Sequence, residues 1–395
     1  MSQDLMRYAA RMDLSKMGAI MPRRMAHIAQ GAPVPPKLDY AANLTAKALH
    51  PKCQKLLVAE VIEREGGAKS FVLRAQEGGE LARFRAGQFL SFSLAIGGST
   101  ITRAYSLCCP PSWAKQGKYM ITVKPSEDGF AGNWICANWH EGTQVTASAP
   151  LGEFSYTRLR DARHILGVCG GSGVTPFCAM ACAIAEGSED YSLTLLYGSR
   201  DSDSILLGEE LAALAQRCER FTLVNVLERG GGDESGYITT ELIKKYMPEG
   251  DCSLFVCGPA AMMQAMETAI APLGLPERRI RRKTYGVTEA ALEADWPQEA
   301  AGKTFSLTVK MRDQTYTVPC ASGETVLVAM ERAGLEPPSR CRSGECGWCR
   351  SRLSAGTVYI PARTEHRRKA DLAYGYIHPC CSFPTSDLTL CVGCE

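Results

Sequence analysis

The chain has 395 residues, a formal net charge of +2, and nearly equal numbers of basic and acidic side chains. This length allows two to four domains, and the balanced charge argues against nucleic acid or an anionic membrane as the partner. The N-terminus has no continuous apolar core followed by a small-residue cleavage site, so we expect no secretory signal. The 18 cysteines therefore indicate reduced thiols and metal ligands in a cytoplasm rather than disulfides.

Residues 1–50 are expected to form a helical extension and a linker. Six of the 14 methionines lie in the first 25 residues, and GAPVPPK at 31–37 is typical of an extended linker. Met-rich helices suit adaptable contact surfaces, so this segment is a candidate for docking the chain into a larger complex. A helix packed on its own protein is the alternative.

Residues 51–160 show short stretches of alternating apolar and polar residues with turns between them. This pattern predicts an antiparallel β-barrel. The expected strands are KLLVAEVIE, SFVLRA, GQFLSFSL, TRAYSL, KYMITVK and GTQVTAS.

Residues 161–287 alternate strand and helix patterns, which predicts an α/β domain with an open parallel sheet of the doubly wound kind. The expected strands are HILGVCG, LTLLYGS, FTLVNVLE and LFVCG. The uncharged run at 165–185 is long enough to span a membrane. Its GGSG and Pro176 break it into strand, loop and helix, so we expect no membrane span.

A connector at 288–303 precedes a third unit at 304–395. FSLTVKM and QTYTVPC predict a hairpin, and GETVLVAMERAG predicts a helix that Gly334 caps. CRSGECGWC then places Cys341, Cys346 and Cys349 in a C-x4-C-x2-C pattern. Zinc sites more often use C-x2-C pairs, and a fourth thiol must come from elsewhere in the chain.

Three further motifs carry candidate chemistry. GGSGVTP, at 170–176, joins a strand to a helix whose N-terminus attracts a pyrophosphate; a tight structural turn is the alternative. RAYSL, at 103–107, offers an arginine for phosphate, an aromatic ring for stacking and a hydroxyl for a ring nitrogen. CGP, at 257–259, ends the last expected parallel strand, where open α/β sheets bind ligands; a buried structural cysteine is the alternative.

In chain order, RAYS, PLGEF (150–154), GGSGVTP, YGSR (197–200) and VCGPAAMM (256–263) resemble the ferredoxin–NADP reductase superfamily over residues 52–285. The third unit resembles a plant-type [2Fe–2S] ferredoxin, which implies an α+β β-grasp fold. The whole resembles three-part reductases of the phthalate dioxygenase and phenol hydroxylase reductase type.

The resemblance implies roles for individual residues. The fourth cluster ligand is expected at Cys380, with Cys381 as the runner-up and a zinc site as the alternative. Ser106, near the reactive flavin nitrogen, and Cys257, near the hydride path, are the implied catalytic residues. The implied cofactor contacts are Arg103, Ala104, Tyr105, Ser106, Gly132 and Asn133 for the flavin, Gly170, Gly171, Gly173, Thr175, Ser199, Arg200, Cys257, Gly258 and Pro259 for the nicotinamide nucleotide, Tyr285 at the end of the reductase part, and Cys341, Cys346, Cys349 and Cys380 for the cluster.

Three positions depart from the family pattern. Gly132 stands where relatives often have a phosphate-binding serine, which leaves FAD or FMN open. Lys283 stands two residues before Tyr285, where relatives often have a glutamate. The chain ends in CVGCE; two thiols cannot close a tetrahedral metal site, so we expect Cys391 and Cys394 in an exposed tail.

Nicotinamide coenzymes give two electrons as a hydride, an iron–sulfur cluster accepts one at a time, and a flavin exchanges electrons in both ways. The sequence therefore predicts an NAD(P)H-dependent reductase that passes single electrons through its cluster to a partner protein. That partner is an oxygenase component, a ferredoxin or an anaerobic metalloenzyme. An assembly subunit of a larger redox complex, and the reverse reaction from reduced ferredoxin to NAD(P)+, are the alternatives. The choice between NADH and NADPH stays open, because Arg200 in YGSR suits a 2′-phosphate but is not specific to it.

Overall fold

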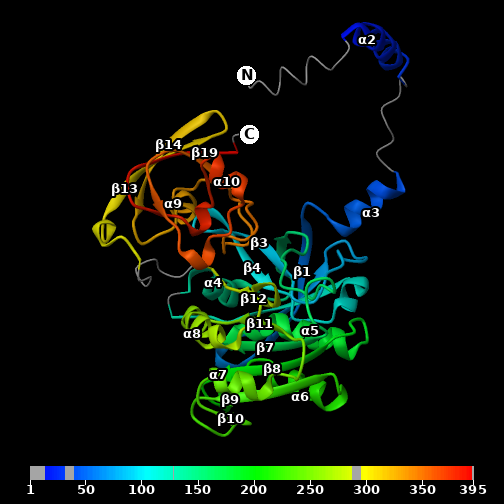
Figure 1. Cartoon of the computed structure of the whole chain (residues 1–395), viewed down its shortest axis with the longest axis vertical. Helices are drawn as coiled ribbons and strands as arrows, with labels where there is room; N and C mark the ends of the chain where they lie inside the picture. The colour runs from blue at the N-terminus through cyan, green and yellow to red at the C-terminus, as the bar shows by residue number, and fades with distance from the viewer. Residues whose placement is uncertain (1–13, 32–39, 128, 287–294, 394–395) are drawn as a thin grey trace. The chain divides into compact units, whose positions relative to one another are not determined.

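The computed structural model describes residues 14–31, 40–127, 129–286 and 295–393, and the chain divides into two compact units at 1–47 and 48–395 (Figure 1). Helix α2 (Leu14–Ala29) lies in the first unit, and α3 (Ala41–Leu49) follows it. Met21 and Met25 of α2 are exposed, and α3 buries no side chain. The expectations for residues 1–13 and for the linker at 32–37 lie outside the described residues.

The expected β-barrel is confirmed for the first part of the second unit. Its six antiparallel strands follow the order β4-β3-β6-β1-β2-β5, and a bridge between Leu107 and Ile121 joins the two outer strands. The sheet thus curls until its edges meet, which leaves one end of the barrel available to a ligand. The elements are β1 (Gln54–Glu63), β2 (Lys69–Ala75), β3 (Phe89–Ile96), β4 (Ser99–Ser106), β5 (Lys118–Val123), α4 (Phe130–Asn138) and β6 (Gln144–Ala147).

A six-stranded parallel sheet follows, in the order β10-β9-β8-β7-β11-β12. The chain moves outward from β7 to β10 and then returns to the other side of β7 with β11. The strand order therefore reverses between β7 and β11, the place where open α/β sheets bind ligands. The elements are β7 (His164–Gly170), α5 (Thr175–Ala185), β8 (Ser192–Ser199), α6 (Gly208–Arg217), β9 (Phe221–Leu227), β10 (Glu234–Ser235), α7 (Thr240–Tyr246), β11 (Ser253–Cys257), α8 (Ala260–Ile270) and β12 (Ile280–Lys283).

Helices cover both faces of this parallel sheet (Figure 1). On one face, α5 and α6 pack on side chains such as Leu195 in a core that continues into the barrel. On the other face, α7 and α8 pack on Leu196 and its neighbours in a separate core. Adjacent residues of β8 thus serve opposite faces, as the two-residue period of a strand requires. No helix within the described ranges is long and apolar enough to cross a membrane.

The C-terminal part is a small α+β domain with the sheet order β14-β13-β19-β15-β17. The expected hairpin and helix are present. Thr325 caps the helix by accepting a hydrogen bond from the Val328 amide, and Gly334 ends it with a φ of +74°. The elements are β13 (Thr304–Met311), β14 (Gln314–Ala321), α9 (Val326–Arg332), β15 (Ser351–Ala355), β16 (Val358–Tyr359), α10 (Lys369–Ala373), β17 (Tyr376–Ile377), β18 (Phe383–Pro384) and β19 (Leu388–Val392).

The expectation of an exposed tail was wrong for Cys391. This residue lies in β19, a central strand that pairs with β13 on one side and with β15 on the other. Its side chain is half-buried. The strand alternates leucine and valine with other residues along its length, and that alternation continues to Val392. Cys394 lies outside the described residues.

Candidate functional site

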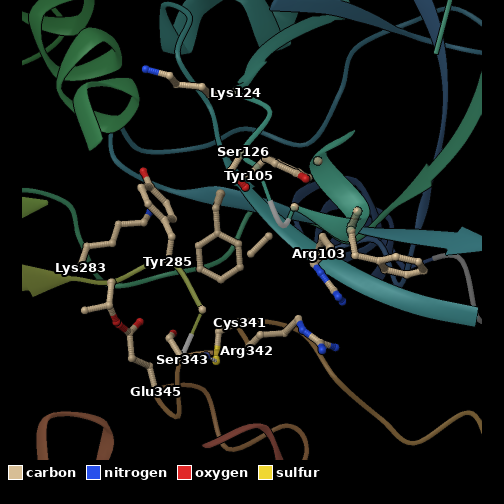
Figure 2. Close-up of a pocket in the computed structure, with 18 residues that line it drawn as sticks. Arg103, Tyr105, Lys124, Ser126, Lys283, Tyr285, Cys341, Arg342, Ser343 and Glu345 are labelled. Carbon is tan, nitrogen blue, oxygen red and sulfur yellow. Dashed lines mark hydrogen bonds between the residues drawn. The ribbon is translucent and has the colours of Figure 1, made fainter. Parts of the chain in front are cut away.

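A cavity of about 350 Å³ lies where three parts of the chain meet (Figure 2). The barrel contributes Arg103 and Tyr105, and the segment after β12 contributes Tyr285. The cluster loop, residues 341–349, contributes Cys341 and Glu345. Four residues of the flavin prediction, Arg103, Ala104, Tyr105 and Gly132, thus lie at the same cavity as a thiol of the cluster prediction. We call this space the flavin cavity.

The flavin cavity suits an anionic group. Arg103 lines it and is held by a 2.8 Å hydrogen bond to the Thr102 carbonyl oxygen. Burial, together with the nearby Arg342 guanidinium, lowers the pKa of Arg103 to about 10, so the group stays charged at neutral pH. Lys124 and the first turn of α4 also line the cavity, and a helix N-terminus offers unpaired N–H groups to a phosphate.

Gly132 and Asn133, in the first turn of α4, differ in what they do. Gly132 lines the flavin cavity, and a methyl group there would meet its nearest neighbour, the Lys124 carbonyl oxygen, at an ordinary contact distance of 3.5 Å. The Asn133 side chain instead accepts a 3.0 Å hydrogen bond from the Ser126 amide and donates a 2.7 Å bond to the Ser126 carbonyl oxygen. Asn133 therefore fixes the loop that leads into the helix and does not line the cavity.

A second cavity, of about 490 Å³, opens at the carboxyl ends of the parallel strands. The predicted residues that line this coenzyme cavity are Gly170, Gly171, Ser199, Arg200 and Pro259. The Ser199 hydroxyl is buried and has no hydrogen-bond partner in the described part of the chain. Buried polar groups are normally paired, so this hydroxyl fits a ligand that brings its own polar atoms.

Two predicted glycines act by close packing rather than by facing the coenzyme cavity. A Cβ atom at Gly173 would lie 2.1 Å from the Cys257 carbonyl oxygen. A Cβ atom at Gly258 would lie 2.5 Å from the Met262 sulfur. The first contact brings the turn after β7 directly against the end of β11, the place where the strand order reverses, and the second packs the end of β11 against α8.

The Tyr285 hydroxyl lies at the junction of three predicted sites. It shares a 3.0 Å hydrogen bond with Ser106 from the barrel and a 3.1 Å bond with Thr175 from the turn after β7. It also interacts with the Cys257 thiol, which is fully buried and lines neither cavity. Burial raises the pKa of Cys257 to about 11, so this thiol stays protonated at neutral pH.

Lys283, the departure from the family pattern, is buried beside the flavin cavity. Its Nζ atom donates a 3.1 Å hydrogen bond to the Gly87 carbonyl oxygen and lies 5.1 Å from the centre of the Phe89 ring. Burial lowers the pKa of Lys283, while the nearby Cys257 and Glu345 oppose the change. The sequence did not reveal that Glu345, from the cluster loop, faces this lysine, because the two residues belong to different domains.

The cluster loop turns sharply around its own sulfur atoms. The amides of Cys346 and Trp348 donate hydrogen bonds of 3.4 Å to the sulfurs of Cys341 and Cys346, respectively. Gly344 has a φ of +79°, and a Cβ atom there would lie 2.4 Å from the Thr364 carbonyl oxygen. A side chain at this position would therefore prevent the loop from closing.

The arrangement of the thiols favours Cys380 over Cys381 as the fourth cluster ligand. The Cys380 thiol interacts with the thiols of Cys341 and Cys349, and the Cys341 thiol interacts with that of Cys346. The Cys381 thiol also touches Cys380, but it donates to the His378 carbonyl oxygen at 3.4 Å. These interactions connect the four thiols predicted from the sequence, and four thiolates is the number that a plant-type two-iron cluster takes.

Sequence reasoning missed four charged residues at these cavities. Lys124 lines both the flavin cavity and the coenzyme cavity, Glu228 lines the coenzyme cavity, and Arg342 and Glu345 reach the flavin cavity from the cluster loop. Lys124 follows an ordinary strand pattern, so nothing marked it. Arg342 and Glu345 lie between cysteines whose spacing pointed to the cluster alone.

Comparison with known proteins identifies each part of the chain. Residues 57–156 match the oxidoreductase FAD-binding domain, residues 168–268 the oxidoreductase NAD-binding domain, and residues 309–385 the 2Fe-2S iron-sulfur cluster binding domain. FAD, NAD(P)H and a [2Fe–2S] cluster are therefore the cofactors, and the choice between FAD and FMN falls to FAD.

Similar proteins carry all three parts in one chain. The ferredoxin reductase component of 3-ketosteroid-9-alpha-monooxygenase from Mycobacterium tuberculosis is 33% identical over 347 residues, which cover 84% of this chain and 94% of that protein. The glycine betaine monooxygenase reductase subunit of Pseudomonas aeruginosa is 28% identical, with 84% and 93% covered. In structure, phthalate dioxygenase reductase matches with a TM-score of 0.62 at 23% identity, covering 86% of this chain and 97% of that chain.

The three family models match in the order flavin, nicotinamide and cluster, and these relatives are similar along most of the chain. The chain therefore belongs to the ferredoxin–NADP reductase superfamily, as an NAD(P)H-dependent flavin reductase that ends in a plant-type [2Fe–2S] ferredoxin domain.

Proposed function

We propose that this reductase supplies single electrons to an oxygenase component in the cytoplasm. NAD(P)H gives two electrons as a hydride, the cluster accepts one at a time, and the flavin links the two because it exchanges electrons in both ways. The observation that carries the proposal is the flavin cavity, which Tyr285 borders from the coenzyme side and Cys341 from the cluster side. The names of the relatives, which are reductase components of monooxygenases, support the choice of acceptor.

Within the flavin cavity, the chain's own residues have separable tasks. Arg103 and Lys124 would hold the phosphates together with the α4 N-terminus, and Tyr105 would contact the flavin from the barrel side. Ser106 does not line the cavity but is tied to it through Tyr285. Cys341, Cys346, Cys349 and Cys380 would hold the cluster.

At the coenzyme cavity, Gly170 and Gly171 would let the backbone approach the coenzyme closely, and Ser199 and Arg200 would contact its adenosine end. The buried Lys283 stands near the flavin cavity, where relatives often carry a glutamate. It therefore offers an amine, whose pKa burial lowers, in place of a carboxylate. We propose that Lys283 in its protonated form stabilises negative charge beside the flavin.

Replacing Cys346 with serine tests the path of the electrons. The Cys346→Ser variant should lose iron and lose reduction of cytochrome c, which accepts electrons at the ferredoxin domain. It should keep NAD(P)H oxidation by ferricyanide, which accepts electrons from the flavin directly. Iron content, absorption spectra and both rates, measured on anaerobically purified protein, give the result.

The matched control is Arg103→Ala, which removes a cation of the flavin cavity and leaves the cluster loop intact. This variant should lose flavin and both activities while it keeps its iron. The proposed path is wrong if the cluster-free Cys346→Ser protein reduces cytochrome c at the rate of the native protein. In that case the flavin would deliver electrons directly and the ferredoxin domain would not be the exit.

A further inference from the structure

The surface beside the exposed end of the cluster loop is basic and carries two large aromatic side chains. We propose that this surface docks an electron acceptor whose own face around its cofactor is acidic; the inference rests on the proposed function and specifies its partner. The docking face consists of Arg340, Trp348, Arg350, Arg352, Lys369 and Tyr374, all in the ferredoxin domain.

The four cluster thiols differ in solvent exposure, and the exposed one marks the side from which electrons would leave the cluster. Cys341 is buried and lines the flavin cavity, and Cys349 and Cys380 are also buried. Cys346 is exposed, and its sulfur accepts a hydrogen bond of 3.4 Å from the Trp348 amide. A cluster held by these thiols would face the flavin cavity beside Cys341 and solvent beside Cys346.

Contacts join the docking face into two groups, one around Trp348 and one around Arg350, and these two residues are only two positions apart in the chain. The Arg340 guanidinium lies 3.4 Å from the centre of the Trp348 ring. Arg350 lies 5.7 Å from the centre of the Tyr376 ring, and Arg352 is the partner of Tyr376 between strands β15 and β17. An Arg350 nitrogen also lies 3.9 Å from Asp371 in α10, the helix that Lys369 begins and Tyr374 follows.

The charge of this region is positive, in contrast to the balanced charge of the chain. Residues 336–376 contain eight arginines and lysines against four acidic residues. Two of the four acids are paired with bases of the same range, Glu365 with Arg367 and Asp371 with Arg368, so these pairs add no net charge. Of the remaining residues, Arg342 is paired with Glu331, and the acids Glu336 and Glu345 are exposed.

The barrel adds to the positive charge. Lys52 lines a shallow cavity together with Arg340 and Ser339 of the ferredoxin domain. Trp348, on which Arg340 is stacked, is 51% exposed, and Tyr374, which follows α10, is 72% exposed. Aromatic and arginine side chains dominate the binding energy of protein interfaces, so exposed rings and arginines suit a contact surface.

An acidic protein partner fits these features better than a basic one. Opposite charges steer diffusing proteins together, and repulsion between like charges suppresses wrong partners. The aromatic rings then supply the contact area that a purely electrostatic encounter lacks. A soluble protein with carboxylates around its own redox centre is therefore the partner that we infer.

Two haem proteins of opposite surface charge test the inference: cytochrome b5, which is acidic, and cytochrome c, which is basic. As the salt concentration is lowered, the native reductase should reduce cytochrome b5 faster and cytochrome c more slowly. The variant Arg352→Glu with Lys369→Glu should lower kcat/KM for cytochrome b5 about tenfold and raise it for cytochrome c. Both side chains are exposed, so the change leaves the core and the thiols untouched.

A matched control makes the same charge change elsewhere on the domain. Lys310→Glu with Arg312→Glu alters exposed residues of the β13–β14 hairpin, at the sheet edge opposite to β17. This control should leave both rates within about twofold. A second variant, Arg340→Gln, removes the charge stacked on Trp348 and should weaken cytochrome b5 reduction even if the double variant folds poorly.

The rate of flavin reduction by NAD(P)H and the iron content should be native in every docking variant, which separates this test from that of the proposed function. Loss of either would mean damage to the reductase half and would count against a pure docking role. Equal effects of the control and the docking variants, or rates that do not depend on salt, would overturn the inference. So would binding of the native protein to phosphatidylserine vesicles that the double variant loses, because the face would then recognise a membrane.

Discussion

A single phenol, that of Tyr285, joins the barrel to the turn of the coenzyme domain, and its hydrogen bonds have a fixed direction. Thr175 donates its one hydroxyl hydrogen to the Ser172 carbonyl oxygen at 2.9 Å. Tyr285 must therefore donate to Thr175, and Ser106 must donate to Tyr285. The chain of hydroxyl groups leads from the barrel, past the flavin cavity, to the turn that faces the coenzyme cavity.

Two side chains of opposite charge, Arg200 and Glu228, line the coenzyme cavity and bear on coenzyme choice. Arg200→Ala should lower kcat/KM for NADPH about tenfold and for NADH by less than about threefold, because only NADPH offers a 2′-phosphate for a charge-assisted bond. Steady-state rates with both coenzymes and ferricyanide give the comparison.

Glu228→Gln is the companion variant. It removes a negative charge that would repel a 2′-phosphate, and it keeps the size of the side chain, so NADPH use should improve relative to NADH. The Tyr237 hydroxyl still has an oxygen acceptor in this variant. Equal losses with both coenzymes after Arg200→Ala would show that other residues make the choice.

At the scale of elements, the turn between β7 and α5 depends on a glycine that must lie against β11. Gly173→Ala would place a methyl group 2.1 Å from the Cys257 carbonyl oxygen, so the turn must move away from the strand. We expect the free energy of unfolding to fall by about 1–3 kcal/mol and the coenzyme to bind more weakly. Chemical denaturation and coenzyme titration give the two values.

Gly323→Ala is the control for this prediction, because a methyl group at Gly323 meets no atom within 4 Å and the backbone has no positive φ there. Its stability should change by less than about 0.5 kcal/mol. If Gly173→Ala is as harmless as this control, the close approach of the two loops does not shape the coenzyme cavity.

Most elements could be predicted because their apolar residues repeat with the period of a strand or a helix. Strand β12 escaped this reasoning. Its sequence, IRRK, is almost entirely charged, yet Arg281 and Lys283 are buried. Arg281 pairs with the buried Asp161 at 2.6 Å, so a buried ion pair takes the place of apolar side chains. Patterns of hydrophobicity cannot find a strand that is held in this way.

The candidate site, too, could be predicted from the sequence only in part. Motifs within one loop, such as the three thiols of the cluster loop and the glycines after β7, could be found from the sequence because their spacing carries the chemistry. The meeting of Tyr285 with Ser106 and Thr175, and of Lys283 with Glu345, depends on how domains pack. No local pattern encodes such contacts, so the structure was needed to find them.

At the scale of the molecule, the first 47 residues form a unit of their own. A variant that begins at Ala48 should keep its flavin, its iron and its NAD(P)H–ferricyanide rate, and its melting temperature should stay within a few degrees, because no described residue of the first unit lines either cavity. Absorption spectra and thermal melts check this.

The same truncation tests the docking role that the sequence suggested for this segment. Size-exclusion chromatography compares the sizes of the native and truncated proteins. If residues 1–47 hold copies or partners together, the truncated protein should elute as a smaller assembly; if they do not, the two proteins should differ only by the mass of the removed segment. Loss of flavin or a much lower melting temperature would contradict the separation of the two units.

Lys124 borders both cavities, and this sharing has a thermodynamic consequence. The Lys124 ammonium group attracts both anionic ligands, so the binding of one ligand changes the binding free energy of the other. Linkage is reciprocal: the factor by which bound FAD changes the affinity for the coenzyme equals the factor by which the coenzyme changes the affinity for FAD. Coenzyme titrations of flavin-free and flavin-loaded protein measure that factor, and Lys124→Met should bring it closer to one. The two halves of the reductase thus communicate through a shared charge even before any electron moves.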